Sequence, residues 1–266
     1  MDQAVKEKYN RLLDYISSFE KVGVACSGGV DSTLLAHAAI QALGPQSVLI
    51  LFAESCLLAE ATTHRIDNLF LREFSQPVQF NKITVDVLAD SELTRNDQTR
   101  CYTCKKKIYT ELLKQLRRNK ITTLFDGTNC DDLNEDRPGL KAIKELGVIT
   151  PLVETGFYKK DIRVLARALN LSNADLASDS CMATRIETGR KITYSLLQQI
   201  EQMEAFMKSL GYLGCRVRPR SERVIIEVLK KDLSRIVAEG ERQAIETYFQ
   251  HNGYPKVLLD LKPRKG

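Results

Sequence analysis

The sequence predicts an α/β fold with a doubly wound, mostly parallel sheet, followed by a small C-terminal α+β domain. Short apolar runs alternate with amphipathic helical patterns over the first 170 residues, as in parallel sheets with crossover helices. A glycine- and serine-rich turn joins the first apolar run to the next helix. After residue 193 the pattern changes to a long helix and two alternating segments, which indicate a separate domain.

Hydrophobic periodicity defines the elements of the first 170 residues in order. Helices are expected where apolar residues recur at helical spacing, and strands where short apolar runs stand between polar segments. The expected helices cover residues 4–19, 33–40, 59–74, 105–118 and 159–170. The expected strands cover residues 22–26, 48–53, 80–85, 122–125 and 148–149. We expect the third of these strands to pair with the fourth.

The remaining segments complete the predicted organisation. Residues 96–104 and 128–139 are polar and are expected to be loops. A helix over 194–210, a hairpin, two short helices and a final strand over 257–261 follow. The predicted domains are a nucleotide-binding domain at 1–170, a linker at 171–193 that carries Cys181, and a substrate or oligomerisation domain at 194–266.

Composition excludes several classes of protein. The chain has 266 residues, is 43% hydrophobic and shows neither a secretory signal nor an apolar run that spans a membrane, so we expect a cytoplasmic protein. The net charge of +5 permits an anionic substrate and does not require nucleic acid. Seven scattered cysteines in such a chain are more often catalytic or metal-binding than disulfide-bonded.

The turn after the first strand has the chemistry of a phosphate site. It consists of Ser27, Gly28, Gly29, Val30, Asp31 and Ser32. Glycines let the backbone approach a ligand, and the free N–H groups of the following helix attract anions. Asp31 would repel a phosphate unless Mg²⁺ lay between them, so we expect a metal-bound polyphosphate and a catalytic role for Asp31. The structural alternative is a tight turn with a Ser/Asp cap.

No lysine follows the glycines, which distinguishes this turn from the common phosphate loop. SGGVDS resembles the PP-loop of ATP pyrophosphatases, which adenylate a substrate and release pyrophosphate. The resemblance implies ATP and Mg²⁺ as cofactors. Parallel sheets bind ligands at the carboxyl ends of their strands, so Ala53, Gly127 and Asp132 are expected to complete the ATP site. The acidic loop at 128–139 either holds Mg²⁺ or is a solvated loop.

The cysteines indicate a metal cluster. Cys101 and Cys104 have the spacing of a metal half-site, but no second pair or histidine motif completes a zinc site. A thioredoxin-like dithiol is an alternative, although such a motif follows a first strand and opens a helix. Three cysteines suit a 4Fe–4S cluster with one open iron, and Cys181 is the best third ligand. Cys26 and Cys56 are expected to be buried and to act as small hydrophobic residues. Cys130 and Cys215 are weaker candidates for a cluster ligand.

Three motifs together resemble the LarE family of ATP-dependent sulfur transferases in nickel-pincer cofactor biosynthesis. They are SGGVDS, DRPGLKA at Asp136–Ala142 and CMATR at Cys181–Arg185. The resemblance implies that ATP adenylates a carboxylate of pyridinium-3,5-biscarboxylic acid mononucleotide and that sulfur then displaces AMP, leaving a thiocarboxylate. In one type of this family a cysteine gives up its own sulfur and becomes dehydroalanine. In the other, three cysteines hold a cluster, and Cys101, Cys104 and Cys181 place this chain there.

The resemblance also assigns site residues. Cys181 corresponds to the family's reactive cysteine, and Arg216 and Arg218 correspond to its substrate-phosphate arginines, a role that suits bidentate guanidinium groups. Alternate charges on an exposed strand face are the simpler interpretation of these arginines. Glu227 in the next strand is expected to face the same site. Arg185 either stabilises the thiolate or adenylate charge or caps a local turn.

Two other functions fit part of the pattern. A tRNA-thiolating enzyme would share the loop and the cysteines, but the chain lacks extra CxxC pairs and has few basic runs, at 105–107 and 117–118. A non-catalytic ATP-binding iron–sulfur carrier would bind ATP without releasing pyrophosphate. The expected partners are therefore ATP, the pyridinium substrate and a sulfide donor, without nucleic acid or membrane, and we expect a homo-oligomer.

Overall fold

The computed structural model describes residues 3–74, 78–134, 138–176 and 180–264. These residues form two compact units. The first comprises Met1–Ala89 and Thr99–Leu176, and the second comprises Asp90–Gln98 and Ala177–Gly266. Within the described ranges no helix is both long and apolar enough to cross a membrane.

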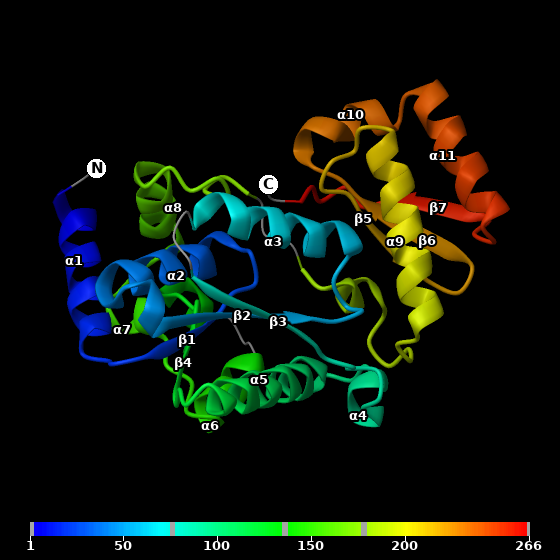
Figure 1. Cartoon of the computed structure of the whole chain (residues 1–266). Coiled ribbons are helices and arrows are strands. Elements are labelled where there is room, and N and C mark those ends of the chain that lie inside the picture. The colour runs from blue at the N-terminus through cyan, green and yellow to red at the C-terminus, as the bar shows by residue number, and fades with distance from the viewer. Residues whose placement is uncertain (1–2, 75–77, 135–137, 177–179, 265–266) are drawn as a thin grey trace. The chain divides into compact units, whose positions relative to one another are not determined.

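The first unit is built on a parallel four-stranded sheet (Figure 1). Its strands are β1 (Val22–Ala25), β2 (Val48–Glu54), β3 (Gln79–Thr84) and β4 (Thr123–Asp126), in the order β3-β2-β1-β4. Ile149 adds a single parallel bridge to Phe125. The predicted α/β class with a mostly parallel sheet is confirmed.

The predicted pairing of the third strand with the fourth is wrong. β3 pairs with β2, while β4 pairs with β1 at the other edge of the sheet. Every residue of β1 is buried, as expected for a central strand, whereas β3 alternates between exposed and half-buried residues. This half-buried pattern suits an edge strand, which has one neighbour in the sheet.

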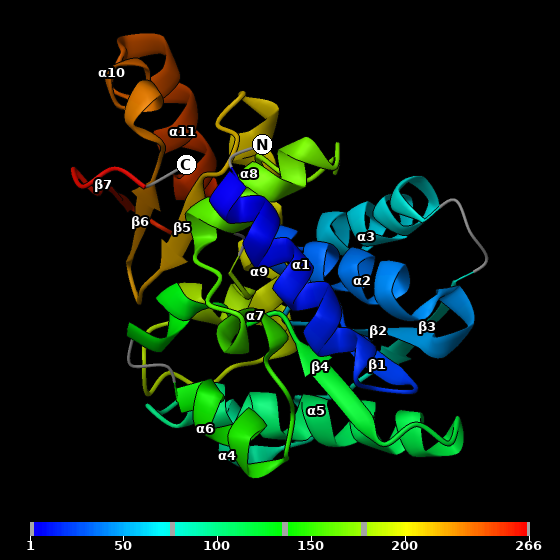
Figure 2. The ribbon, with the colours of Figure 1, turned by 90° about the vertical axis from the view of Figure 1, so that its left-hand side faces the viewer.

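Helices cover both faces of this sheet (Figures 1 and 2). One face packs against α1 (Gln3–Ser17), α2 (Val30–Leu43), α3 (Glu60–Glu73) and α8 (Lys159–Ala168). The other packs against α5 (Arg100–Arg118) and α6 (Pro138–Glu145). Short turns complete the unit: η1 (Pro45–Ser47), η2 (Cys130–Asn134) and α7 (Pro151–Glu154). Side chains alternate between the two cores along β2, with Ile50 on the α2 side and Leu51 on the α5 side.

Helix α5 begins earlier than predicted. The sequence places Cys101 and Cys104 in a loop before a helix at 105–118, but the helix starts at Arg100 and includes both cysteines. The N–H of Thr103 donates to the carbonyl of Thr99 at 3.0 Å and closes the first turn. Apolar periodicity does not reveal this turn, because its side chains are polar and the first buried residue of the helix is Tyr109.

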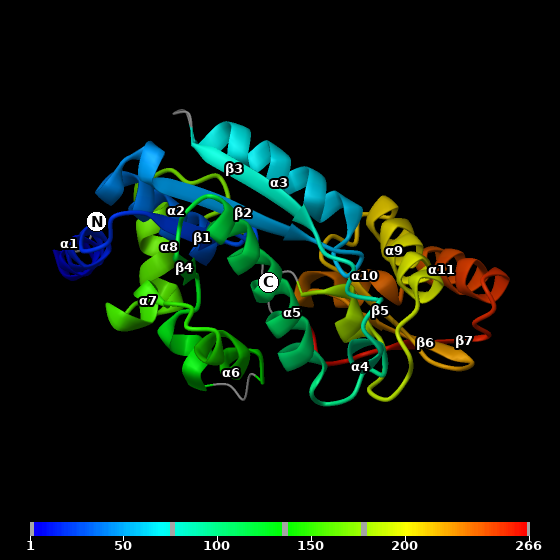
Figure 3. The same cartoon turned by 60° about the horizontal axis from the view of Figure 1, so that its bottom comes forward.

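The second unit contains a three-stranded sheet, β5-β6-β7, with β5 antiparallel and β7 parallel to β6 (Figure 3). Its strands are β5 (Arg216–Pro219), β6 (Arg223–Glu227) and β7 (Lys256–Leu259). Its helices are α4 (Ser91–Thr94), η3 (Met182–Arg185), α9 (Tyr194–Ser209), η4 (Lys230–Asp232), α10 (Leu233–Ile236) and α11 (Glu239–His251). The rings of Phe206 on α9 and Tyr248 on α11 stack with centroids 3.6 Å apart. With 13 residues, α11 is longer than the short helix expected there.

Residues 90–98 belong to the second unit through specific hydrogen bonds. The side-chain amide of Asn96 donates to the carbonyls of Glu187 at 2.8 Å and Arg190 at 3.0 Å. The N–H of Ile192 donates to the carbonyl of Thr94 at 2.9 Å. Asn96 is buried and has a positive φ of 57°, a conformation that asparagine tolerates better than most residues. The segment between β3 and α5 is therefore anchored to residues far along the chain.

Candidate functional site

The Ser27–Ser32 turn lies at the carboxyl edge of the parallel sheet. It follows β1, whose last residue, Ala25, is in register with Leu51 of β2 and Asp126 of β4. The end of β2 and the residues after β4 therefore flank the turn on both sides. A Cβ atom at Gly127 would lie 2.9 Å from the backbone nitrogen of Ser32, so only glycine permits this approach.

Internal hydrogen bonds hold the turn. The Ser27 N–H donates to the hydroxyl of Ser32 at 3.2 Å, and that hydroxyl donates to the carbonyl of Gly29 at 3.1 Å. Gly28 has a φ of 75°, in the region that favours glycine. From beyond α8, the buried amide of Asn173 donates to the Gly28 carbonyl at 3.1 Å. The turn is thus held open at the N-terminus of α2, where helix N–H groups attract anions.

A lysine reaches this turn from a distant part of the chain. The Nζ of Lys159, at the start of α8, lies 2.6 and 2.8 Å from the two carboxylate oxygens of Asp31. Burial raises the pKa of Asp31, Lys159 opposes this effect and Asp132 adds to it. The Lys159 N–H also donates to Asp131 at 2.6 Å. Local motifs in the sequence do not reveal Lys159 as a partner of Asp31, because the two residues are 128 positions apart.

Two carboxylates at this edge suit a magnesium ion. Asp132 contributes to the raised pKa of Asp31, and an oxygen of Asp132 accepts the Asn129 N–H at 3.0 Å. Mg²⁺ commonly takes one or two carboxylates, with waters and substrate phosphates as its remaining ligands. Across the parts of the chain that the structure describes, no three His, Cys, Asp or Glu side chains gather as a metal site.

The predicted cluster ligands lie on both units. Cys101 is exposed and Cys104 is half-buried, and both lie in the first turns of α5 in the first unit. Cys181 is half-buried at the start of η3 in the second unit. None of the three forms a disulfide. The structure therefore brings two of the three predicted ligands together on one helix.

The remaining cysteines differ in burial. Cys26 and Cys215 are buried, and burial raises the pKa of both thiols. Cys56 is half-buried, so the expectation of a buried hydrophobe is wrong there; it follows the end of β2, where the chain leaves the core. Of the DRPGLKA motif, Asp136 and Arg137 lie outside the described residues, and the rest begins α6.

Arg185 is bound by internal contacts. Its buried guanidinium pairs with both carboxylate oxygens of Glu204 on α9, at 2.9 and 3.2 Å. Its Nη1 donates to the carbonyls of Ser180 at 2.5 Å and Cys181 at 3.1 Å. Arg185 thereby ties the backbone around Cys181 to α9, which favours the interpretation as a local cap.

Arg218 and Glu227 form an ion pair across the hairpin. The guanidinium of Arg218 contacts both oxygens of Glu227, the second at 3.2 Å. Arg218 also donates to the carbonyl of Thr184. The charge of Arg218 is therefore already compensated, and this side chain links β5 to η3.

Arg216 lies on the same face of β5 in a different environment. Its Nε is buried and has no hydrogen-bond partner among the residues that the structure describes. Burial, with further contributions from Arg264 and Arg185, lowers the pKa of Arg216 to about 10. Glu227, which is in register with Arg216 on β6, acts in the opposite direction on this pKa.

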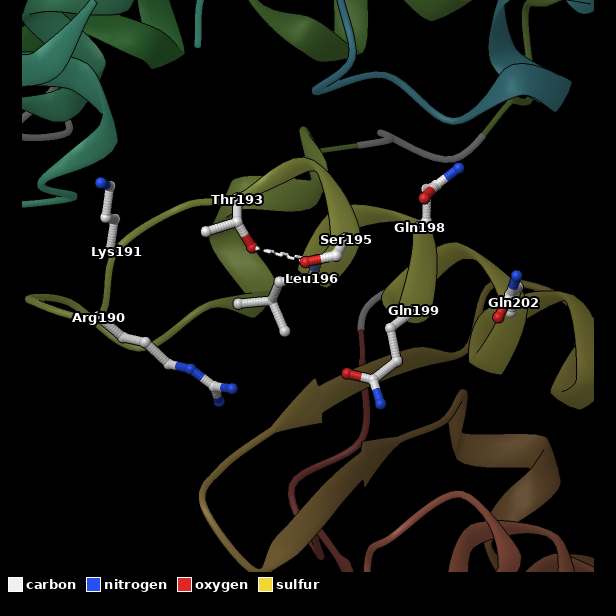
Figure 4. A pocket seen from close by; sticks show the side chains of 8 residues that line it. All are labelled: Arg190, Lys191, Thr193, Ser195, Leu196, Gln198, Gln199 and Gln202. Carbon is white, nitrogen blue, oxygen red and sulfur yellow. Dashed lines mark hydrogen bonds between the residues drawn. The ribbon is translucent and has the colours of Figure 1, made fainter.

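A cavity of about 640 Å³ lies beside the start of α9 (Figure 4). Its lining consists of Leu196 and seven residues with polar side chains: Arg190, Lys191, Thr193, Ser195, Gln198, Gln199 and Gln202. The hydroxyls of Thr193 and Ser195 face each other at 3.2 Å, and Lys191 points away from Arg190. None of the predicted site residues lines this cavity.

The edge of the sheet defines the class of protein. A glycine–serine turn between a central parallel strand and a buried helix, without the lysine of the common phosphate loop, characterises the ATP-using enzymes of the PP-loop class. No family model matches the chain.

Comparison with known proteins identifies the family within this class. The chain is 30% identical over 250 residues to the pyridinium-3,5-bisthiocarboxylic acid mononucleotide synthase of Lactiplantibacillus plantarum, covering 94% of this chain and 89% of the relative. It is 31% identical over 243 residues to an uncharacterized protein of Methanocaldococcus jannaschii, covering 91% and 90%. The chain thus belongs to the LarE family of pyridinium-3,5-bisthiocarboxylic acid mononucleotide synthases. A more distant match, 29% over 185 residues, is one chain of the glutamine-hydrolyzing GMP synthase of Methanoculleus marisnigri, covering 64% and 56%.

Proposed function

We propose that this protein is an ATP-dependent sulfur transferase. It adenylates a carboxylate of pyridinium-3,5-biscarboxylic acid mononucleotide and converts it to a thiocarboxylate in nickel-pincer cofactor biosynthesis. The observation that carries the proposal is the glycine–serine turn at the carboxyl edge of the sheet, with Asp31 in the first turn of α2. A carboxylate is a poor electrophile, and adenylation gives it AMP as a leaving group.

In this proposal the first unit binds Mg–ATP. The N–H and hydroxyl groups of the Ser27–Ser32 turn hold the β- and γ-phosphates, and the backbone at Ala53 and Gly127 borders the adenine. Asp31 and Asp132 hold Mg²⁺, whose carboxylate preference they match. Lys159, which pairs with Asp31, adds the positive charge that stabilises departing pyrophosphate.

The second unit binds the substrate phosphate. Arg216 has a buried, unused donor and a cluster of cationic neighbours, and both features favour an anionic ligand. Arg218 supports this site while Glu227 fixes its orientation. Arg185 is a positioning residue that holds the backbone at Cys181.

Cys101, Cys104 and Cys181 are the proposed ligands of a 4Fe–4S cluster. Cys101 and Cys104 lie three residues apart on one helix, so they suit two thiolate positions of one cluster. Cys181 is proposed as the third ligand. The cluster would supply hydrosulfide as the sulfur nucleophile. This chain's own residues provide the thiolates and, through Arg185, the orientation of the Cys181 loop, while the adenylated carboxylate belongs to the substrate.

The test of ATP chemistry is product analysis with the pyridinium substrate. We expect AMP and pyrophosphate, because the turn lacks the lysine that suits γ-phosphate transfer. ADP and phosphate as the sole products would contradict the proposal. Without the pyridinium substrate, adding total tRNA should not change the basal rate of AMP formation.

The test of sulfur transfer is turnover by anaerobically purified protein with measured iron and acid-labile sulfide. We expect several thiocarboxylates per chain, an intact Cys181 and equal loss of activity in Cys101→Ala, Cys104→Ala and Cys181→Ala. A Cys181 peptide that loses H₂S in proportion to product, with active Cys101→Ala and Cys104→Ala variants, would instead identify Cys181 as a sacrificial donor.

A further inference from the structure

We propose that Cys101 and Cys104 are a redox-active dithiol, which closes to an intramolecular disulfide by exchange with small anionic disulfides of the glutathione type. This activity goes beyond sulfur transfer. One consequence rests on the proposed function: a chain oxidised in this way has lost two of its cluster ligands.

Helix geometry permits the bond. The two cysteines lie three residues apart inside α5. With a rise of 1.5 Å per residue, 3.6 residues per turn and a radius of about 2.3 Å, their Cα atoms are roughly 5 Å apart. Disulfides accept Cα separations of about 4.4–6.8 Å. The pair lies in the first turns of α5, at the start of a helix as in redox-active CxxC motifs, although α4 rather than a strand precedes this helix.

The two thiols differ in accessibility, which suggests an order of attack. Cys101 is exposed and Cys104 is half-buried. The Cys101 thiolate attacks one sulfur of the small disulfide, forms a mixed disulfide and releases one small thiolate. Cys104 then loses its proton, and its thiolate attacks the Cys101 sulfur and releases the second small thiolate. Two protein thiols lose two electrons and two protons, and the small disulfide gains the two electrons.

Charge favours an anionic partner at the exposed sulfur. Arg100 Nη2 donates to the Sγ of Cys101 at 3.8 Å. The sulfur also lies at the positive end of a 19-residue helix. An anionic disulfide therefore approaches Cys101 more readily than a neutral one of similar size.

The other half-buried cysteines of the first unit provide internal controls. Burial raises the pKa of Cys56 and of Cys130, which lowers the thiolate fraction of both and slows their exchange. Neither forms a disulfide in the structure. Oxidation of Cys101 and Cys104 in preference to these two residues would thus distinguish a specific dithiol from general thiol oxidation.

The experiment uses the full chain, reduced, free of iron and exposed to oxidised glutathione. Alkylation of remaining thiols and peptide mapping should find a Cys101–Cys104 disulfide that dithiothreitol reverses. Cys104→Ser should accumulate one glutathione on Cys101, and Cys130→Ser should behave like the unchanged protein. Alkylated Cys101 and Cys104 beside oxidised Cys56 or Cys130, or a disulfide joining either one to Cys181, would overturn the proposal.

A second arm tests the partner's charge. Arg100→Gln should slow oxidation by oxidised glutathione about threefold, the scale of one exposed charge near the reacting atom, and affect neutral hydroxyethyl disulfide less. If Arg100→Gln slows oxidation by the two disulfides to the same extent, the charge preference is refuted.

A third arm separates this inference from the proposed function. The oxidised chain should take up no iron and sulfide until it is reduced. Uptake by the oxidised chain would refute the link between the disulfide and cluster loading. If the reduced chain also fails to take up a cluster, the proposed cluster fails, while the disulfide result stands.

Discussion

At the scale of single residues, two arginines on one strand have different environments. Arg216 and Arg218 project from the same face of β5. Glu227 and the Thr184 carbonyl bind Arg218, whereas the Arg216 Nε has no partner in the described part of the chain. Alternation in the sequence puts both arginines on one face but does not reveal that Arg218 is ion-paired while the Arg216 Nε has no partner among the described residues.

Arg216→Gln should therefore weaken binding of the pyridinium mononucleotide. A charge-assisted hydrogen bond is worth about 1.5–3 kcal/mol, so the dissociation constant should rise about tenfold or more. ATP affinity should be unchanged in titration calorimetry, and Arg223→Gln, at an exposed position of β6, should have little effect. A loss of ATP affinity with normal substrate binding would refute the assignment.

Lys159→Met should impair the ATP step. The variant removes a charge 2.6 Å from Asp31 and leaves a carboxylate without its cation next to the phosphates. We expect pyrophosphate release to fall about tenfold or more, the range for the loss of one charged donor. The neighbouring exposed residue provides the control Lys160→Met. Equal rates of pyrophosphate release in both variants would show that Lys159 has no part in the reaction.

At the scale of elements, one buried cluster ties α5 to the carboxyl end of β4. Buried Asp126 accepts hydrogen bonds from Tyr109 and Thr128, and Lys105 lies 3.3 Å away. Burial alone would raise the pKa of Asp126, but Lys105, Thr128 and Tyr109 outweigh it and lower the pKa below 3.8. The helix that carries the CxxC pair is thereby attached to the sheet edge that carries Gly127.

Tyr109→Phe should reduce the free energy of unfolding by about 1–3 kcal/mol at pH 7, since a buried carboxylate loses a donor. A lowered carboxyl pKa stabilises the fold above its unfolded value of 3.8, and this contribution disappears as the pH falls through the lowered pKa. Urea unfolding from pH 7 to pH 3 should show the difference shrinking. Tyr102→Phe, at the surface of the same helix, should cost less than about 0.5 kcal/mol. A pH-independent deficit in Tyr109→Phe would exclude the linkage to Asp126.

At the scale of the whole molecule, the chain leaves the first unit after residue 89 and re-enters it at residue 99. Residues 90–98 are held by residues 187–192, so the second unit is made of two separate parts of the sequence. The first unit is also made of two parts of the sequence, because residues 90–98 interrupt it.

A fragment ending at residue 176 should therefore expose residues 90–98. It lacks the carbonyls that accept from Asn96 and the N–H that donates to Thr94. Limited trypsin digestion should cut the fragment after Arg95 many times faster than the full chain, as expected for a segment without its hydrogen bonds. Equal cleavage of both proteins would show that this segment is stable without the second unit.

Local patterns in the sequence determined much of this protein. The strand, glycine–serine turn and helix at 22–43 lie within one short stretch, so residue spacing alone predicts this turn and the α/β class. The strand order, the Asp31–Lys159 pair and the anchoring of Asn96 depended on the tertiary structure. Each joins segments far apart in the chain, and burial selects the partner: fully buried β1 requires two neighbours, while β3 tolerates an edge. The start of α5 was hidden for a related reason, because polar side chains form its first turn and periodicity detects only the buried face of a helix.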